Sequence, residues 1–296
     1  MDRPLSGALA TTGRRTIGTE DNHSEVSPAM ALATQDIDIA QVEYRTAGYH
    51  RHTESLSADE TGRIRDSIDR ISRQTRPEVV FEKDTEVVRA VHGCHLFDET
   101  SARLVRHPLL LGLAESIIGE PVYVYQFKVN LKQPFEGAAW PWHQDYTFWR
   151  NEDGMTDDRA VNIAVLLDDT HEGNGPLQVL PGTHELGLVE TAGRAGRSGD
   201  WRQHVAADLE YTVPDDVAER LREEYGKELI VGPAGSVFAF HPSIVHASSS
   251  NRSPDRRAML LITYNAVSNA PHSSPRPEFL VSKDTTPVTV FAGTTL

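Results

Sequence analysis

The stretch Val122-Tyr-Val-Tyr-Gln-Phe-Lys-Val-Asn-Leu-Lys132 alternates between apolar and polar side chains. A period of two is typical of a β-strand, because successive side chains point to opposite faces of a sheet. The apolar face is expected to pack against helices, and the polar face to look into solvent or a wet cavity. The side chains expected on the apolar face are Tyr123, Tyr125, Phe127, Val129 and Leu131, and those on the polar face are Gln126, Lys128, Asn130 and Lys132.

Helical patterns precede this stretch, and short strands follow it. A capping box at Ser57-Ala-Asp-Glu60 begins an amphipathic helix to about residue 74, and a second helical region covers 101–118 with Pro108 at a first-turn position. Helices first and many short strands later predict a mainly β fold with flanking helices, arranged as a double-sheet jelly roll. The further strands are expected at residues 79–81, 86–91, 160–167, 177–180, 235–240 and 258–266.

The domain organisation expected from the sequence is simple, because no stretch within it reads as a linker. Residues 1–40 are rich in Ser, Thr, Ala and Asp without periodicity, which predicts a flexible N-terminal arm. Residues 41–296 are then the jelly-roll domain. Within it, residues 189–229 interrupt the strands, carry a helix near 214–225, and are expected to form an insertion beside the active site.

Charge and cysteine content limit the partners and the compartment. The net charge of −14 argues against nucleic acid, an anionic membrane surface or an acyl-CoA as a partner. A single cysteine, Cys94, excludes an internal disulfide framework and suits a reducing compartment. With no basic-then-apolar leader and no long apolar run, we expect a soluble cytoplasmic protein. The oligomeric state stays open, a homo-oligomer included.

Three residues point to a metal centre. His143 and Asp145 flank Gln144, and His246 lies far downstream in Ile-Val-His-Ala. Two imidazoles and one carboxylate form the facial triad of non-haem Fe(II) oxygenases, which leaves three coordination positions open. Residues two apart in an extended segment share a side, and another strand would have to bring the second histidine. Taken alone, a His-x-Asp pair is weak evidence for a metal site. The same sequence would result if His143 merely capped a turn and Asp145 were simply exposed.

Arg257 strengthens the metal hypothesis, because a guanidinium at the start of an apolar strand can pair with the distal carboxylate of 2-oxoglutarate. Arg256 is its alternative, but Arg257 shares parity with the inward residues of the strand. Asn130 and Asn162 are polar residues in strands expected to be buried, where each needs a partner. A cosubstrate carboxylate, a backbone group or a water would satisfy Asn162 equally well.

Four residues are candidates for contacts with a substrate. Gln126 shares the polar face of its strand with Asn130, and Trp149 follows the metal motif closely, although core packing explains an aromatic there as well. Arg89 and His92 lie on or near a strand and could receive a substrate carboxylate, with surface exposure as the alternative for Arg89.

Five motifs of the chain resemble the phytanoyl-CoA dioxygenase superfamily, in particular its branch of ectoine hydroxylases and bacterial free L-proline trans-4-hydroxylases. The resemblance runs from about residue 43 to 289. The ectoine pattern has His-Ser-Asp-Phe-Glu-Thr-Trp-His where this chain has His143-Gln-Asp-Tyr-Thr-Phe-Trp-Arg150, and an Asn where this chain has Met259. The motifs are Trp-Pro-Trp-His143-Gln-Asp145-Tyr, Glu152-Asp-Gly-Met155, Asn174-Gly-Pro-Leu177, Pro181-Gly-Thr-His184 and Pro275-Arg-Pro-Glu-Phe-Leu280.

The resemblance implies a double-stranded β-helix, the cupin-like version of the jelly roll. By the same resemblance the iron ligands are His143, Asp145 and His246. Arg257 would anchor 2-oxoglutarate with Asn130 and Asn162 as helpers, while Gln126 and Trp149 would contact substrate. Three further segments are closer to the proline enzymes than to the ectoine enzymes: Val88-Arg-Ala-Val-His-Gly-Cys-His95, Gln126-Phe-Lys-Val-Asn130 and His184-Glu-Leu-Gly-Leu188.

We therefore expect an Fe(II)- and 2-oxoglutarate-dependent dioxygenase that uses O₂ to hydroxylate a free amino acid, foremost L-proline at C4, with succinate and CO₂ as co-products. Ascorbate is expected to help in vitro. Asp145 favours hydroxylation over halogenation, because related halogenases replace this carboxylate with a small residue. One alternative is hydroxylation of another small amino acid or of ectoine. Another, from a different class, is a non-catalytic jelly-roll protein that binds a metal or ligand.

Overall fold

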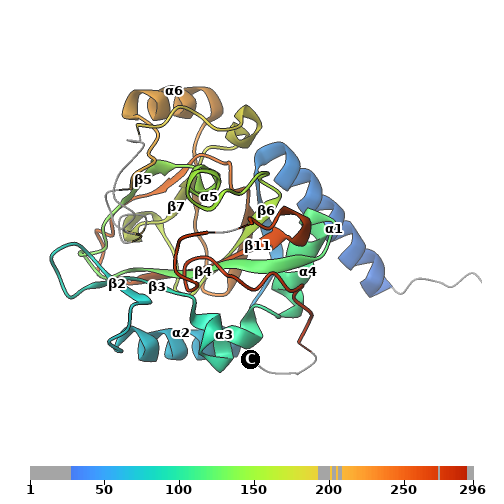
Figure 1. Cartoon of the computed structure of the whole chain (residues 1–296), viewed down its shortest axis with the longest axis horizontal. Helices are drawn as coiled ribbons and strands as arrows, with labels where there is room; N and C mark the ends of the chain where they lie inside the picture. Colours follow the sequence, from blue (N-terminus) through green and yellow to red (C-terminus); the bar gives the residue numbers. More distant parts are fainter. Residues whose placement is uncertain (1–27, 193–200, 202–204, 206–208, 273, 292–296) are drawn as a thin grey trace, which may run out of the picture.

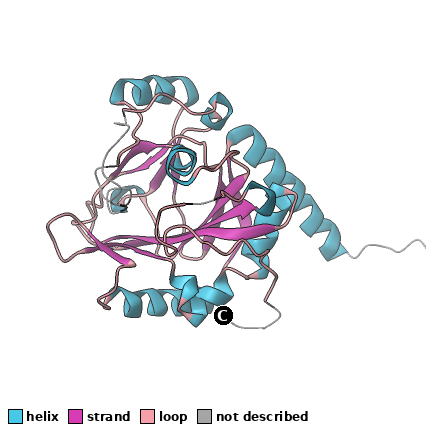
Figure 2. Cartoon of the chain, viewed as in Figure 1, coloured by secondary structure: helices cyan, strands magenta, loops and turns pink. Residues whose placement is uncertain are grey.

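Two antiparallel sheets form the centre of the protein, as the jelly-roll prediction requires (Figures 1 and 2). The computed structural model describes residues 28–192, 201, 205, 209–272 and 274–291. The large sheet has the order β1 (Tyr49–Ser55), β9 (Ser236–Phe240), β6 (Ala160–Leu166), β11 (Arg257–Ala266), β4 (Val122–Lys132), β3 (Val88–His92) and β2 (Val79–Phe81). The small sheet has the order β5 (Trp140–His143), β10 (His246–Ser248), β7 (Leu177–Val179) and β8 (Glu228–Ile230).

The expected strands are present with ends within two residues of those predicted. The strand ranges predicted from the sequence do not include β1, β5, β8 or β10. Strand β1 is polar along most of its length, and the other three have only three or four residues. Runs this short show no periodicity, so only their pairing partners identify them as strands.

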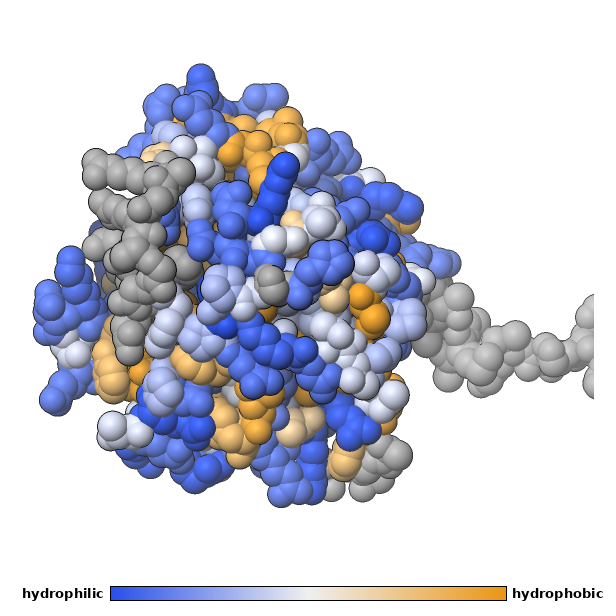
Figure 3. Space-filling view, in the orientation of Figure 1, coloured by the Kyte–Doolittle hydropathy of each residue, from blue (hydrophilic) through white to orange (hydrophobic). Residues whose placement is uncertain are grey.

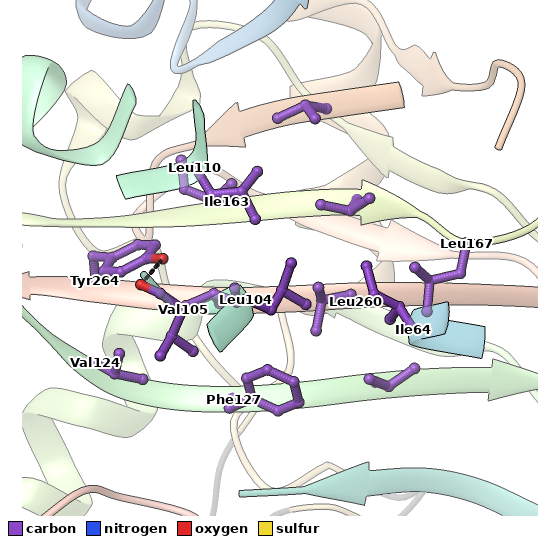
Figure 4. Packing of buried hydrophobic residues seen from close by; sticks show 14 of the residues in the cluster. Ile64, Leu104, Val105, Leu110, Val124, Phe127, Ile163, Leu167, Leu260 and Tyr264 are labelled. Carbon is purple, nitrogen blue, oxygen red and sulfur yellow. Dashed lines mark hydrogen bonds between the residues drawn. The ribbon is translucent and has the colours of Figure 1, made fainter. Parts of the chain in front are cut away.

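Helices cover the outer face of the large sheet. α2 (Ala58–Ser72) begins at the predicted capping box, with Ser57 and Glu60 bonded reciprocally. α3 (Glu99–Leu104) and α4 (Pro108–Ile118) form the second helical region, and Pro108 occupies the first turn of α4 as predicted. Figure 4 shows how Ile64 of α2 and Leu104 of α3 pack against Leu260 of the sheet. Each fully buried side chain of this size contributes roughly 1.5–3 kcal/mol, so this layer is a main source of stability.

Strand β4 departs from the alternation that the sequence predicted. A register shift in its pairing with β11 lies where Thr263 opposes Gln126 and Tyr264 opposes Val124. The intervening residue, Tyr125, is the extra residue of a β-bulge, which reverses the facing of the strand on its N-terminal side. Tyr123 and Tyr125 therefore lie in a separate cluster with Trp149, and Val122 and Val124 take their place beside the three later apolar residues on the face towards the helices. The expectation of one continuous apolar face was wrong here.

α1 (Pro28–Ala47) packs into the same core through Ala40 and Tyr44 and contacts α4, whereas α5 (Asp145–Asp153) and α6 (Asp215–Tyr225) lie outside it. The arm expected at residues 1–40 differs from the structure from Pro28 onward, because α1 is helical there, while residues 1–27 lie outside the described residues. α6 agrees with the helix predicted within residues 189–229. Short 3₁₀ turns occupy Cys94–Leu96, Glu172–Asn174, Thr183–Leu186 and Val267–Asn269.

The surface agrees with the polar composition. The face seen in Figure 3 is mostly hydrophilic, with scattered apolar patches. Among the described helices, none is long and apolar enough to cross a membrane.

Candidate active site

The three predicted metal ligands meet between the two sheets. His143, Asp145 and His246 are all buried, and each offers a ligand atom within 4.8 Å of the others. His143 ends β5 and His246 begins β10, and the two residues oppose each other directly in the small sheet. The prediction that another strand would bring the second histidine is therefore confirmed by the pairing of β5 with β10.

Hydrogen bonds to the backbone orient both imidazoles. Nδ1 of His143 lies 2.7 Å from the carbonyl of Pro141, and Nδ1 of His246 lies 3.0 Å from that of Ile244. A proton on each Nδ1 leaves each Nε2 as a lone-pair donor. Both Nε2 atoms lie 3.9 Å from oxygens of Asp145. This arrangement presents two nitrogens and one carboxylate to a common point, as a divalent metal requires.

The protonation states also suit a metal. Burial, followed by the neighbouring His246, lowers the pKa of His143 to about 3, and burial likewise lowers the pKa of His246. Burial alone would raise the pKa of Asp145, but Lys128 and the two imidazoles hold that pKa at about 2. Neutral imidazole and ionised carboxylate are the ligand forms that iron binds. The side chains present therefore fit an Fe(II) ion.

The local fold explains the short spacing between the first two ligands. Gln144 is extended (φ −120°, ψ 126°) and caps α5, which begins at Asp145. The side chain of Gln144 donates to the carbonyls of Gly187 and Ser243, and its oxygen accepts from the backbone N–H of Val189. The sequence prediction of a continuous extended segment was thus only half right: a single extended residue, fixed by three hydrogen bonds, joins a strand to a helix.

Arg257 lies in the same cavity, whereas Arg256 does not. Arg257 is 1% exposed, and its Nε and Nη2 donate to the carbonyl of Gly175. Its Nη1 is buried without a partner among the described residues. Burial lowers the pKa of Arg257 to about 9, which leaves it charged at neutral pH. Arg256 points away from the cavity, as its parity predicted, and pairs with Asp168 and with Asp69 of α2.

Three further polar atoms of the cavity wall are buried without a partner in the part of the chain that the structure describes. These are Nε2 of His92, Oδ1 of Asn130 and Oγ of Ser248. Asn130 was predicted from the polar face of β4. Ser248 was missed, because β10 is too short for a periodic signal. Both residues line the cavity together with Arg257: the hydroxyl of Ser248 can donate to a ligand carboxylate, whereas Oδ1 of Asn130 needs a donor from a ligand or from water.

The candidate substrate-contact residues Gln126, Trp149 and His92 line the same cavity, and burial lowers the pKa of His92 to about 3. Lys128 and Arg276 also line it and were not predicted as site residues. Lys128 stands on the polar face of β4 and could have been included by its parity. Arg276 lies in an irregular segment, within the motif Pro275-Arg-Pro-Glu-Phe-Leu280, which carried the family resemblance but indicated no role for this side chain.

Two predicted site residues have other positions. Arg89 was expected to contact substrate, but it lies outside the described lining of the cavity. A register irregularity between β2 and β3 places it behind Trp140, with its guanidinium 3.7 Å from the ring centroid and bonded to Glu82. Asn162 was expected to help bind the cosubstrate. Its Nδ2 instead donates to Asp145 over 3.0 Å, so it supports a metal ligand.

Comparisons with known proteins agree with this geometry. The phytanoyl-CoA dioxygenase (PhyH) family model matches residues 44–259. L-proline trans-4-hydroxylase of Streptomyces griseoviridis is 56% identical over 251 residues, which cover 84% of this chain and 94% of that protein. Ectoine dioxygenase of Bordetella parapertussis is 34% identical over 250 residues, covering 81% and 80% respectively. The crystal structure of EctD from S. alaskensis with 2-oxoglutarate and 5-hydroxyectoine has a TM-score of 0.72 at 27% identity, covering 86% of each chain. The chain therefore belongs to the phytanoyl-CoA dioxygenase family.

Proposed function

We propose that this protein hydroxylates free L-proline to trans-4-hydroxy-L-proline, using Fe(II), 2-oxoglutarate and O₂ and releasing succinate and CO₂. The observation that carries the proposal is the cavity, where a facial triad, a buried Arg257 and two further cations face one space. The choice of proline rests on the relative from Streptomyces griseoviridis, which is far more similar to this chain than the ectoine dioxygenases at 34% identity or less.

The metal would be held by Nε2 of both histidines and by the carboxylate of Asp145. When bound, iron with 2-oxoglutarate and O₂ supplies the oxidising power for inserting one oxygen atom into a C–H bond. Asn162 fixes the rotamer of Asp145 through its hydrogen bond, and Oδ1 of Asn162 in turn accepts from Thr263 over 2.6 Å. The ligand set is thus oriented before the metal arrives.

The cosubstrate would bind on the side of Arg257. Nη1 of Arg257 and the hydroxyl of Ser248, both without a partner among the described residues, are donors for the distal carboxylate of 2-oxoglutarate. Lys132, on the neighbouring strand β4, pairs with Arg257, but Nζ of Lys132 donates to the carbonyls of Ala138 and Ser249. Burial, followed by the Arg257 charge, lowers the pKa of Lys132 to about 6. Arg257 is therefore the permanent charge at this end.

The substrate would bind between β3, β4 and the segment around Arg276. A zwitterionic amino acid needs a cation for its carboxylate and hydrogen-bond acceptors for its ammonium group. Lys128 and Arg276 are the cations here, and Gln126 supplies an amide oxygen. His92 is neutral because burial and these two cations lower its pKa. Trp149 is 1% exposed and provides an apolar wall that a pyrrolidine ring can contact.

We place this reaction in the cytoplasm, which the chemistry of the one cysteine supports. Cys94 is free and buried, and burial raises the pKa of its thiol to about 12. A thiol in this state neither forms disulfides nor reacts readily.

The test is a turnover assay with purified protein, Fe(II), ascorbate, 2-oxoglutarate and air, read by mass spectrometry. L-Proline is offered beside pipecolate, leucine and ectoine, and the product is compared with authentic hydroxyproline isomers. We expect trans-4-hydroxyproline in equal amount to succinate. Hydroxylation of ectoine or another amino acid in preference to proline would show that proline is not the substrate of this enzyme. Metal binding without any succinate would favour a non-catalytic binding protein.

A further inference from the structure

A buried carboxylate, Asp153, holds Arg276 at the cavity. Asp153 is 1% exposed, and its carboxylate accepts from Nε of Arg276 over 2.8 Å and also from Nη2 of the same guanidinium. The hydroxyl of Ser274 donates to it over 2.6 Å, and the hydroxyl of Tyr125 donates as well. Four donors saturate this carboxylate, so the Arg276 side chain has one well-defined position.

Helix α5 carries both Asp153, which holds Arg276, and the candidate metal ligand Asp145. α5 begins at Asp145 and ends at Asp153. At 1.5 Å per residue the two ends lie about 12 Å apart along the helix axis. A helix changes its length very little, so α5 fixes the position of the Arg276 guanidinium relative to the metal.

The segment that carries Arg276 is fastened at two further points. The backbone N–H of Ser282 donates to the carbonyl of Tyr125 over 3.0 Å, at the bulge of β4. Phe279 packs against Gly93, where φ is +60° and an added Cβ would lie 2.7 Å from the Phe279 backbone. Only glycine fits this backbone conformation and this close approach. The segment therefore cannot move independently of β3, β4 and α5.

We propose that Asp153 is a positioning residue that sets which carbon of the substrate is oxidised. It does so by fixing the distance between the metal and Arg276, which binds the substrate carboxylate. The inference rests on the proposed function. An amino acid anchored by its carboxylate presents its carbons at increasing distances from the anchor, and neighbouring carbons differ by one bond length. A misplacement of about 1 Å can cost a hundredfold in rate, so a small shift of the anchor changes the preferred carbon.

The experiment compares the wild type with Asp153→Asn and Asp153→Glu. Asp98→Asn is the matched control, because Asp98 is also a buried carboxylate paired with an arginine, Arg70, but lies outside the site. Three quantities are measured: L-proline affinity of the metal-free protein by calorimetry, the hydroxyproline isomers formed, and the ratio of succinate to hydroxyproline. The KM for 2-oxoglutarate is measured beside them.

For Asp153→Asn we expect proline affinity to fall at least tenfold, other hydroxyproline isomers to appear, and succinate to exceed hydroxyproline. The KM for 2-oxoglutarate should stay within threefold of the wild type. Asp153→Glu keeps the charge but lengthens the arm, so affinity should largely recover while the isomer mixture stays altered. Wild-type affinity and a single wild-type isomer in both variants would overturn the proposal. So would the same changes in Asp98→Asn, since they would then reflect destabilisation.

If Asp153→Asn does not fold, Ser274→Ala and Tyr125→Phe test the proposal in its place, because each removes one hydrogen-bond donor to the Asp153 carboxylate. We expect each to weaken proline affinity about threefold and to add a second isomer, and wild-type behaviour of both would overturn the proposal. Failure of the proposed function looks different. In that case the wild type itself forms no hydroxyproline, whereas failure of the Asp153 inference leaves the wild type active.

Discussion

Asn162→Ala tests how the protein prepares its metal site. Asn162 is fully buried on β6, and it donates one hydrogen bond to Asp145 while accepting one from Thr263. It has no place in the described lining of the cavity. Its removal therefore leaves the cosubstrate and substrate surfaces intact and changes only the support of one ligand.

The size of the effect follows from the bond that is lost. A hydrogen bond to a charged group is worth about 1.5–3 kcal/mol, which corresponds to roughly 10- to 100-fold in an equilibrium constant. Mutation of groups that support a metal ligand lowers metal affinity by a similar factor, about 10- to 100-fold. Lys128, at 3.5 Å, remains beside Asp145 and keeps the carboxylate ionised. We therefore expect an Fe(II) dissociation constant 10- to 100-fold above that of the wild type, without complete loss of binding.

Anaerobic calorimetric titration of the metal-free protein with Fe(II) measures this constant. Asn269→Ala is the control, because Asn269 is 2% exposed and bonded to Asp157 and Asn265 but touches no metal ligand. Its Fe(II) affinity should equal that of the wild type. An Fe(II) affinity of Asn162→Ala within threefold of the wild type would refute the reasoning, and so would an equal loss in the control.

Three further predictions concern charge. In a steady-state assay, Arg257→Met should raise the KM for 2-oxoglutarate at least about 100-fold, because removing one partner of a buried charge pair costs about 3–5 kcal/mol. Arg256→Met is the control, since Arg256 lies on the opposite face, and its KM for 2-oxoglutarate should be unchanged. Asp145→Gly should abolish hydroxyproline formation in the mass-spectrometric assay, and wild-type turnover would remove this residue from the ligand set. Burial lowers the pKa of His95 to about 4, below the unfolded value, so its contribution to stability is complete above about pH 6.5 and is lost as the pH falls towards 4. Between pH 7 and pH 5 this residue lowers the free energy of unfolding by about 2 kcal/mol. The free energy of unfolding of metal-free His95→Gln, measured with urea, should therefore fall less over this pH range than that of the wild type.

The sequence by itself predicted the fold class and the three side chains that meet as the candidate metal site. Apolar periodicity, capping signals and turn residues are local properties, and they predicted α2, α4 and the long strands of the large sheet. The metal ligands were also predictable, because iron accepts few ligand types and His143-Gln-Asp145 with a distant His246 supplies them. The parity of β11 alone separated Arg257 from Arg256.

Only the tertiary structure decided that Tyr123 and Tyr125 leave the helix-facing side of β4, that Arg89 stays out of the cavity and that Arg276 enters it. The bulge at Tyr125 reverses the facing of β4, and the irregularity at Arg89 turns that guanidinium towards Glu82 and Trp140. Register shifts of this kind leave no mark in hydrophobic periodicity, because they depend on the partner strand. Arg276 comes from an irregular segment more than 120 residues after Asp153, its partner. Such a contact arises when distant segments pack together, so no local pattern in the sequence could have predicted it.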